Sequence, residues 1–321
     1  MNKIERHYEI HGRRLTVRAP GAQAASMLDH VFSAYAIDDL ESRDLLVDIA
    51  HVDPDTLLEE RTFAGCAEDG TRFSRDERGD LYVEVDGLGA ARIDARNPGA
   101  RVAICVEDPD WEVGHRLVEP VVVELLRGRS LYGIHAGAVA TADGHALLLC
   151  GRSGSGKSTT ALALARSGWG FLADDTCYLD TGAAPARIAA RWSDVHLTET
   201  SLEVLIPAAG RGAAIRPRGS EKYFLRVDRV PDLRPVAQAV PKWIVFPRIE
   251  DRDDAELVDL EPDAALSRIV PQSLVPGRSG IDSAHFDALV ALCGACRCAE
   301  LRSGRNLGAV VGVLQGYVGC S

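Results

Sequence analysis

The chain contains the stretch Gly151-Arg152-Ser153-Gly154-Ser155-Gly156-Lys157-Ser158, which matches the pattern G-x-x-x-x-G-K-[ST] at every defined position. The apolar run Ala146-Leu147-Leu148-Leu149-Cys150 precedes it and is typical of a fully buried strand. Residues 159–166 follow with the composition of a helix, and Gly168 stands where a glycine commonly ends one. The stretch is therefore predicted to be a tight turn between a buried strand and a helix N-terminus.

A turn of this kind can hold a chain of phosphates. Its glycines let backbone N–H groups point inward, and the helix N-terminus adds a partial positive charge. Lys157 is expected to reach the β- and γ-phosphates of a nucleotide, and Ser158 to ligate Mg²⁺. We therefore predict that ATP and Mg²⁺ bind here, through Gly151, Ser153, Gly154, Ser155, Gly156, Lys157, Ser158 and Thr159. A chance glycine-rich turn is the alternative, and the flanking strand and helix argue against it.

A second motif, Phe171-Leu172-Ala173-Asp174-Asp175, follows the predicted helix. An apolar strand that ends in aspartate can place a carboxylate beside a metal bound to the phosphates. The two adjacent acids also allow a division of labour, in which one orients Mg²⁺ or its water and the other accepts a proton from an attacking hydroxyl. Alternatively, either aspartate could serve only as a turn former or a helix cap.

Together these residues resemble a known family. The run from Ile134-His135 through the glycine-rich loop to Ala173-Asp174-Asp175 resembles the catalytic domain of HPr kinase/phosphorylase and its smaller relatives. The resemblance implies an α/β P-loop kinase domain of the HPr kinase/PEP carboxykinase-like type. It also implies that Asp175 accepts the proton of the substrate hydroxyl, that Lys157 binds phosphate and that Ser158 holds Mg²⁺.

The resemblance gives His135 a place near the transferred phosphoryl group, whereas by itself this histidine would read as a core residue. The chain also departs from the family. HPr kinases carry a downstream signature with a metal-binding glutamate, and here only Glu199 stands in the corresponding region, without the surrounding glycines and arginines. With Asp174 and Ser158, Glu199 completes the predicted metal set. The departure indicates a one-way kinase that does not act on HPr.

A basic stretch, Arg216-Pro217-Arg218-Gly219-Ser220-Glu221-Lys222, lies further along the chain. Arg216, Arg218 and Lys222 could close over a triphosphate or bind an anionic acceptor, or they could form a solvated loop before a strand. The chain has only four lysines, Lys3, Lys157, Lys222 and Lys242, so Lys222 marks a position where arginine was not used.

The composition of the chain bears on which partners the protein binds and on the cellular compartment in which it is expected. The formal net charge of -11 argues against nucleic acid or an anionic membrane as the main partner. The first residues lack the apolar core of a signal peptide, and no apolar run is long enough to span a bilayer. With eight scattered cysteines, these features predict a cytoplasmic protein with reduced thiols. Cys293, Cys296 and Cys298 could bind a metal, but small buried residues between a helix and a strand fit better.

Two domains are predicted, a β-rich N-terminal subdomain over 1–110 and the P-loop catalytic domain over 111–321. The first opens with a hairpin around Gly12 and continues with strands near 46–50, 81–85 and 101–106 and a helix near 23–35. A helix is expected over 112–128, at the start of the second. Its tail should contain a helix over 283–294, a strand near 298–302 and a helix over 306–317. HPr kinases form larger oligomers, so the resemblance leaves a homo-oligomer open.

Two functions fit these motifs. The first is a kinase that transfers the γ-phosphoryl of ATP to a hydroxyl, on a serine of a peptide or protein or on a small molecule, with Asp175 as general base. The second is a nucleotide-dependent switch that hydrolyses slowly and acts as a regulatory binding module. A scaffold that has lost catalysis is a third reading, against which the intact Lys157, Ser158 and Asp175 speak.

Overall fold

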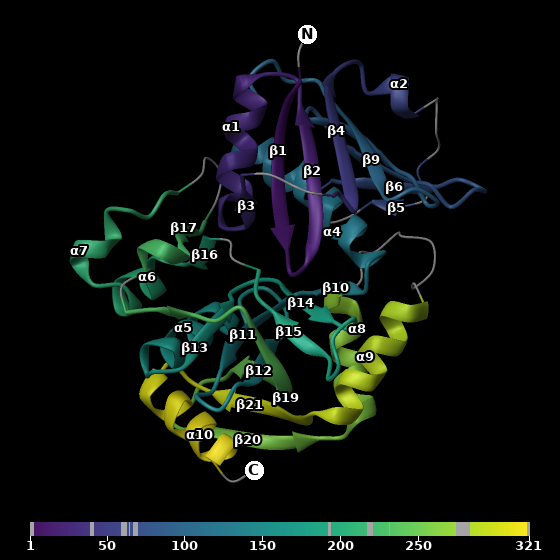
Figure 1. Cartoon of the computed structure of the whole chain (residues 1–321). Coiled ribbons are helices and arrows are strands. Elements are labelled where there is room, and N and C mark those ends of the chain that lie inside the picture. The colour runs from purple at the N-terminus through teal and green to yellow at the C-terminus, as the bar shows by residue number, and fades with distance from the viewer. Residues whose placement is uncertain are drawn as a thin grey trace. The chain divides into compact units, whose positions relative to one another are not determined.

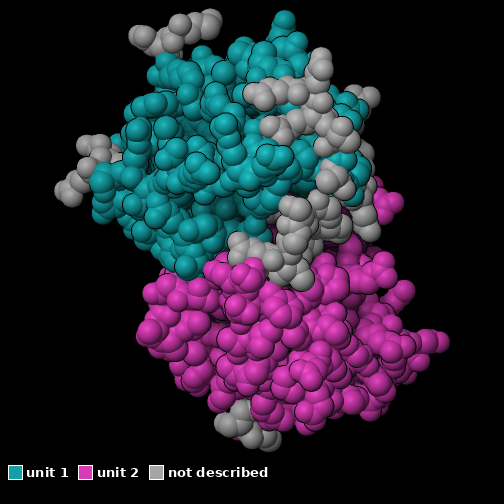
Figure 2. All heavy atoms as spheres, turned by 90° about the vertical axis from the view of Figure 1, so that its right-hand side faces the viewer, with its two compact units in different colours: residues 1–131, 274–281 teal, residues 132–273, 282–321 magenta. Residues whose placement is uncertain are grey.

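The computed structural model describes residues 3–38, 42–58, 63, 65–66, 70–191, 194–216, 221–230, 232–273 and 283–319. The chain divides into two compact units, which Figure 2 colours separately. Unit 1 holds the described residues of Met1–Leu131, and unit 2 holds those of Tyr132–Ser273 and Asp282–Ser321. The protein is of mixed α/β class, with a large sheet in each unit.

Unit 1 is built on a mixed sheet (Figure 1). Its strands, over the described residues, run in the order β3-β1-β2-β4-β9-β8-β7-β6-β5. The predicted hairpin around Gly12 is confirmed, since β1 and β2 pair antiparallel on either side of it. The strands predicted near 46–50, 81–85 and 101–106 are also present. The bounds are β1 (Ile4–Ile10), β2 (Arg13–Ala19), β3 (Ala36–Ile37), β4 (Leu45–His51), β5 (Gly65–Cys66), β6 (Arg72–Arg75), β7 (Leu81–Val85), β8 (Gly89–Ile93) and β9 (Gly99–Ile104).

The helices of unit 1 pack on this sheet. They are α1 (Ala22–Val31), η1 (Ser33–Tyr35), α2 (Asp55–Leu58), α3 (Trp111–Val113), η2 (Gly114–Val118) and α4 (Glu119–Arg127). The last three form the helical stretch that we expected to open the catalytic domain. They contact α1, β7, β8 and β9 instead, so the unit ends at Leu131 and not near residue 110. The apolar face of a helix can dock on either neighbouring sheet, and its sequence does not say which.

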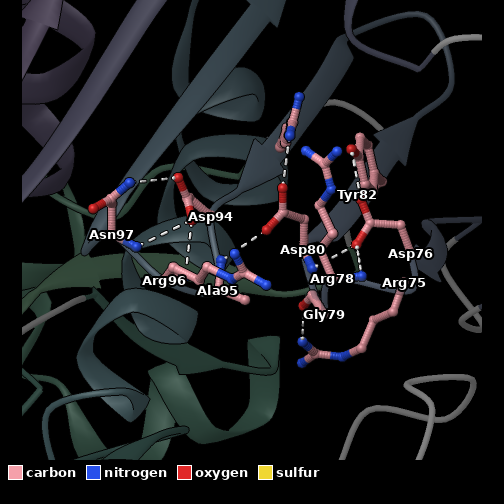
Figure 3. Close-up of polar contacts among 11 residues, drawn as sticks. Arg75, Asp76, Arg78, Gly79, Asp80, Tyr82, Asp94, Ala95, Arg96 and Asn97 are labelled. Carbon is pink, nitrogen blue, oxygen red and sulfur yellow. Dashed lines mark hydrogen bonds and ion pairs between the residues drawn. The ribbon is translucent and has the colours of Figure 1, made fainter.

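Acidic side chains hold the turns of unit 1 (Figure 3). Asp76 accepts hydrogen bonds from the N–H groups of Arg78 and Asp80, and Asp94 accepts them from those of Arg96 and Asn97. The buried carboxylate of Asp80 accepts from both Nε and Nη2 of Arg92, at 3.0 and 2.7 Å, and from the N–H of Ala95 at 3.0 Å. These contacts give Asp76, Asp80 and Asp94 a structural role in the turns.

Unit 2 contains the central sheet of the predicted kinase domain. Over the described residues its main path is β10-β14-β15-β19-β12-β11-β13-β18, and β21 adds to β19 and β20 to β21. The strand bounds are β10 (Leu131–Ile134), β11 (Ala136–Ala140), β12 (His145–Cys150), β13 (Gly170–Ala173), β14 (Cys177–Asp180), β15 (Arg187–Ala189), β16 (Asp194–Leu197), β17 (Tyr223–Arg226), β18 (Arg234–Pro235), β19 (Gln238–Ile249), β20 (Ala255–Leu260) and β21 (Arg297–Ser303). Strands β16 and β17 form a separate pair.

Helices cover both faces of this sheet. The helix, strand and helix that were predicted for the C-terminal part of the chain are confirmed as α9, β21 and α10. Their bounds are α5 (Lys157–Arg166), α6 (Glu199–Leu205), α7 (Ala208–Arg211), η3 (Val227–Arg229), α8 (Pro262–Ser273), α9 (Ser283–Ala295) and α10 (Leu307–Gly319). One core cluster joins the sheet to α5, α6 and α10, and another joins it to α8 and α9. Alternate residues of β12 enter the two clusters, Leu147 and Leu149 the first and Leu148 and Cys150 the second, as a strand buried on both faces requires.

The Asp80 network gives a prediction for unit 1. Asp80→Ala removes the buried carboxylate that accepts hydrogen bonds from Arg92 and from the N–H of Ala95, so it should lower the free energy of unfolding by about 2–4 kcal/mol. The matched control is Asp254→Ala, which removes an exposed partner of Arg252 and should cost under about 1 kcal/mol. Urea unfolding of both variants measures the difference, and equal costs would contradict the structural role.

Candidate functional site

The glycine-rich loop has the conformation that its sequence predicted. It leaves β12 at Gly151 and enters α5 at Lys157, with Gly156 at the helix N-cap. Gly154 and Gly156 have φ values of +82° and +97°, in the left-handed region where a side chain would be strained. The hydroxyl of Ser155 is buried without a hydrogen-bond partner among the described residues. Ser153, by contrast, is exposed. The loop is thus a backbone turn that opens at a helix N-terminus.

The side chain of Lys157 is folded back over this loop. It is 6% exposed, and its Nζ donates to the carbonyl oxygens of Gly151 and Arg152 at 2.6 and 3.2 Å. Burial lowers the pKa of Lys157, and the charges of Asp175 and Asp174 partly oppose this. The ammonium is therefore bonded to the loop and is close enough to the two acids for their charges to act on it.

Strand pairing brings the other predicted residues to the same edge of the sheet. Strand β11 runs antiparallel to β12, with Ala136 opposite Cys150, so His135 lies at the end where the loop begins. Strand β13 runs antiparallel to β11, with Ala138 opposite Ala173, so Asp174 and Asp175 follow at that same end. The loop, the histidine and both acids thus converge, although they are far apart in sequence.

Asp174 is the buried member of the acid pair. It is 2% exposed, and its Oδ2 accepts a hydrogen bond of 2.7 Å from the backbone N–H of His196 in β16. Its Oδ1 is also buried but forms no hydrogen bond of normal geometry with any described residue. Burial raises the pKa of Asp174 to about 6, against the opposing pull of the Ser158 hydroxyl and the His196 N–H. A buried carboxylate oxygen without a donor, near a serine hydroxyl, fits a cation as its missing partner.

Asp175 has a different environment. Its side chain is half-buried, and its Oδ2 lies 3.5 Å from Nδ1 of His135. Burial by itself would raise the pKa of Asp175. The hydrogen bond and charge of His135, with the charges of His196 and Arg191, outweigh burial and hold the pKa below its ordinary value. Asp175 is therefore ionised at neutral pH and reachable from solvent, as a proton acceptor must be.

Gly137 allows the acids to approach the loop this closely. A Cβ on this residue of β11 would lie 2.9 Å from the carbonyl oxygen of Asp174, 3.5 Å from Cβ of Ala161 and 3.7 Å from the carbonyl oxygen of Lys157. No side chain fits between the first turn of α5 and the peptide that carries Asp174. A glycine inside an apolar strand is a sequence signal of such a close approach, although Gly137 was not among the residues predicted for the site.

The basic stretch is only partly described. The charge of Lys222 lowers the pKa of both Asp174 and Lys157 slightly, and its place in the site stays a prediction. The guanidinium of Arg216 lies 5.6 Å from the centre of the Tyr223 ring, and Arg218 is outside the described residues. Strand β17 carries Tyr223 opposite Leu197 of β16, the strand whose His196 N–H binds Asp174.

Two other predicted residues lie beside the site. Thr159 directs its hydroxyl to that of Ser201 at 2.9 Å, which ties α5 to α6. Glu199 is exposed in the first turn of α6, so its place in the metal set stays a prediction. Over the described residues no group of three or more His, Cys, Asp or Glu side chains is arranged to hold a metal. A Mg²⁺ ion that also binds phosphate needs fewer protein ligands than such a centre provides.

The cysteine cluster near the C-terminus belongs to the core. Cys293, Cys296 and Cys298 lie buried where α9 meets β21, in one core cluster with Cys150 and Cys177, so the prediction of small core residues is confirmed. Burial raises the pKa of Cys296 to about 12. No helix among the described residues is both long and apolar enough to pass through a membrane.

Comparisons with known proteins add little to this geometry. No family model matches the chain, and no curated protein matches it. Among solved structures, the chain is similar to the Hpr(Ser) kinase/phosphatase from Coxiella burnetii, with 12% identity, a TM-score of 0.30, and coverage of 58% of this chain and 90% of that one. That likeness is distant and carries no inference about function, so the chemistry must come from the residues themselves.

The role of Gly137 gives a first prediction for the site. Gly137→Ala should lower the free energy of unfolding by about 1–3 kcal/mol, because the added methyl group forces α5 and the Asp174 peptide apart. Gly316→Ala is the control, since a Cβ there meets nothing within 4 Å inside α10 and should stabilise the helix by up to about 1 kcal/mol. Urea unfolding measures both, and a Gly137→Ala protein as stable as the parent would refute the close approach.

The burial of Asp174 gives a second prediction. A carboxyl whose pKa is raised by folding stabilises the fold fully only below its unfolded pKa, about 4, and this contribution is lost as the pH rises through about 6. In metal-free buffer at pH 7, Asp174→Asn should therefore be more stable than the parent, by roughly 1–3 kcal/mol. The gain should vanish near pH 4.

Thermal or urea unfolding between pH 4 and pH 8 checks this. Asp143→Asn is the control, because the pKa of the exposed Asp143 is lowered by Thr141 and His145, and removing its charge should bring no gain at pH 7. A pH-independent difference between Asp174→Asn and the parent would show that the Asp174 carboxyl is not destabilised by burial.

Proposed function

We propose that this protein is a kinase that binds ATP and Mg²⁺ at loop 151–158 and transfers the γ-phosphoryl group to a hydroxyl. The observation that carries the proposal is the pairing of a buried and a solvent-reachable aspartate beside Lys157 at a helix N-terminus. A site that only binds phosphate does not need the second acid. A site that transfers a phosphoryl group to an alcohol needs it, because the alcohol must lose a proton.

Binding of the triphosphate would use the loop and Lys157. The loop amides and the N-terminus of α5 supply positive potential to phosphate oxygens. The Lys157 ammonium now donates to two carbonyls of its own loop, and it would exchange these for phosphate oxygens. Phosphate charge would also offset the burial that now lowers the lysine pKa.

Asp174 and Ser158 would hold the magnesium ion. The unpartnered Oδ1 of Asp174 and the Ser158 hydroxyl supply hard oxygen ligands, and Glu199 is offered as a further one. Mg²⁺, when bound, neutralises charge on the phosphates and helps to orient them. The protein's own part is to keep the Asp174 carboxylate in place, which the His196 N–H does from β16.

Asp175 would accept the proton from the acceptor hydroxyl. It is ionised and half-exposed, and His135 fixes its orientation from the start of β11. A carboxylate with a lowered pKa is a weak base, but the negative charge of a bound triphosphate would raise that pKa again. His135 would thus keep Asp175 ionised before the substrates arrive and hold it in position when they have.

Charge that develops during the transfer would be balanced by cations. Lys222 is close enough for its charge to act on Asp174 and Lys157, which supports a contact with the transferred group. Arg216 and Arg218 are offered as further contacts for the phosphates or for an anionic acceptor. The acceptor is proposed only as an alcohol, on a peptide, a protein or a small molecule.

The test of this proposal uses ATP labelled at the γ-phosphate. The protein is incubated with Mg²⁺, labelled ATP and pools of hydroxyl-bearing peptides and metabolites, and the labelled product is identified. Label transferred to an acceptor supports the kinase. Release of labelled phosphate at the same rate with and without every pool would instead support the nucleotide-dependent switch.

A variant of Asp175 tests the role of the base. Asp175→Asn should reduce transfer by about 10²-fold or more while ATP affinity changes little, because only the proton acceptor is lost. Lys157→Ala serves as the variant that loses ATP binding, and Asp259→Asn as an exposed aspartate outside the site. Titration with ATP and the initial rate of transfer separate the two effects. Turnover within a few-fold of the parent would rule out Asp175 as the base.

A further inference from the structure

An exposed isoleucine lies against the phosphate loop. Ile249 ends β19 and is 54% exposed. A Cβ built on Gly156 would lie 3.7 Å from Cδ1 and 3.8 Å from Cγ1 of Ile249, which is ordinary contact distance. The side chain therefore lies beside the last glycine of the loop, within about one atom's width of it, and more than half of it faces solvent. Because ligand sites combine apolar side chains with a few polar groups, an exposed aliphatic group next to this loop is placed to contact the apolar part of a nucleotide bound there.

The backbone around Ile249 is held firmly. Ile249 pairs in register with Ser303 of β21, and the N–H of Glu250 donates to the Ser303 carbonyl at 2.8 Å. The next turn passes so close to Gly304 that a Cβ there would meet the carbonyl oxygen of Arg252 at 1.6 Å. The Arg252 side chain is itself bonded to Asp254 and Glu256, each at 2.7 Å. The pairing with β21 and the close packing at Gly304 thus fix the backbone that carries Ile249, as a preorganised contact requires.

The sheet order places Ile249 and the acid pair on opposite sides of the loop. Strand β12 carries the loop and has β11 and then β13 on one side, where Asp174 and Asp175 follow. On its other side is β19, which runs parallel to β12 and ends at Ile249. A nucleotide with its γ-phosphate toward the acids would therefore extend its α-phosphate and nucleoside toward Ile249.

We propose that Ile249 is the apolar platform on which the base of the bound nucleotide packs. This inference rests on the proposed function, and it adds a residue for the nucleoside to those predicted for the phosphates. An aliphatic side chain in contact with one face of the base gains from the apolar area it covers. It gives no such gain to a ligand that has phosphates but no base.

The experiment compares ATP with inorganic tripolyphosphate, which retains the phosphates and lacks the nucleoside. Dissociation constants of both are measured by calorimetry in Mg²⁺ buffer for the parent, Ile249→Ser and Ile249→Leu. The matched control is Val290→Ser. Val290 is another exposed aliphatic residue, and it lies on α9, a helix of the core cluster that does not contain α5. Thermal unfolding of each variant verifies that the fold is intact.

Ile249→Ser should weaken ATP by about five- to tenfold, the scale of one lost apolar contact, and leave tripolyphosphate unchanged. Ile249→Leu should restore most of the ATP affinity, and Val290→Ser should alter neither ligand. Unchanged ATP affinity in Ile249→Ser would overturn the inference. Equal loss for both ligands would overturn it too, since Ile249 would then only shape the loop. A parent that bound neither ligand would refute the proposed function itself, and with it the platform.

Discussion

The site depends on the burial of one carboxyl group. Asp174 is removed from water between β13, β16 and the first turn of α5, and the protein offers it one strong hydrogen bond, from the His196 N–H. Taking a carboxylate out of water is costly unless partners compensate it, and here one oxygen has none among the described residues. A buried carboxylate oxygen without a hydrogen-bond donor is typical of a site where a bound ligand supplies the missing partner. The raised pKa of Asp174 reports the same imbalance.

The neighbouring Asp175 shows how one position along the chain changes the chemistry. Successive side chains leave a strand end in different directions, so one acid faces the core and the other faces His135 and solvent. Their pKa values move in opposite directions as a result. Pairs of carboxyls whose environments separate their pKa values in this way commonly divide roles. This contrast is the basis for giving Asp174 to the metal and Asp175 to the proton.

Strand order arranges the rest around that pair. The loop leaves the sheet between the strand group that carries the acids and the group that carries Ile249. Ligands of α/β proteins bind at the carboxyl ends of strands, and here three such ends, those of β12, β13 and β19, meet at one edge. On one side of the loop this edge carries the charged Asp174 and Asp175, and on the other side it carries the apolar Ile249. The fold thus makes the two sides of the loop chemically different, which the loop sequence by itself does not.

The sequence by itself determined the local parts: the buried strand, the glycine turn, the helix that follows it and the aspartates after the next strand. These follow from residue type and short-range spacing, because glycine torsions and strand burial are local properties.

Only the tertiary structure decided how those parts act together. The His196 N–H on Asp174, the place of Gly137 beneath α5 and the position of Ile249 beside Gly156 bring together residues that are distant in sequence. The helical stretch 111–127 likewise joined unit 1, since its apolar face suits more than one sheet. Burial and hydrogen bonding depend on which segments meet in space, and no local pattern records that.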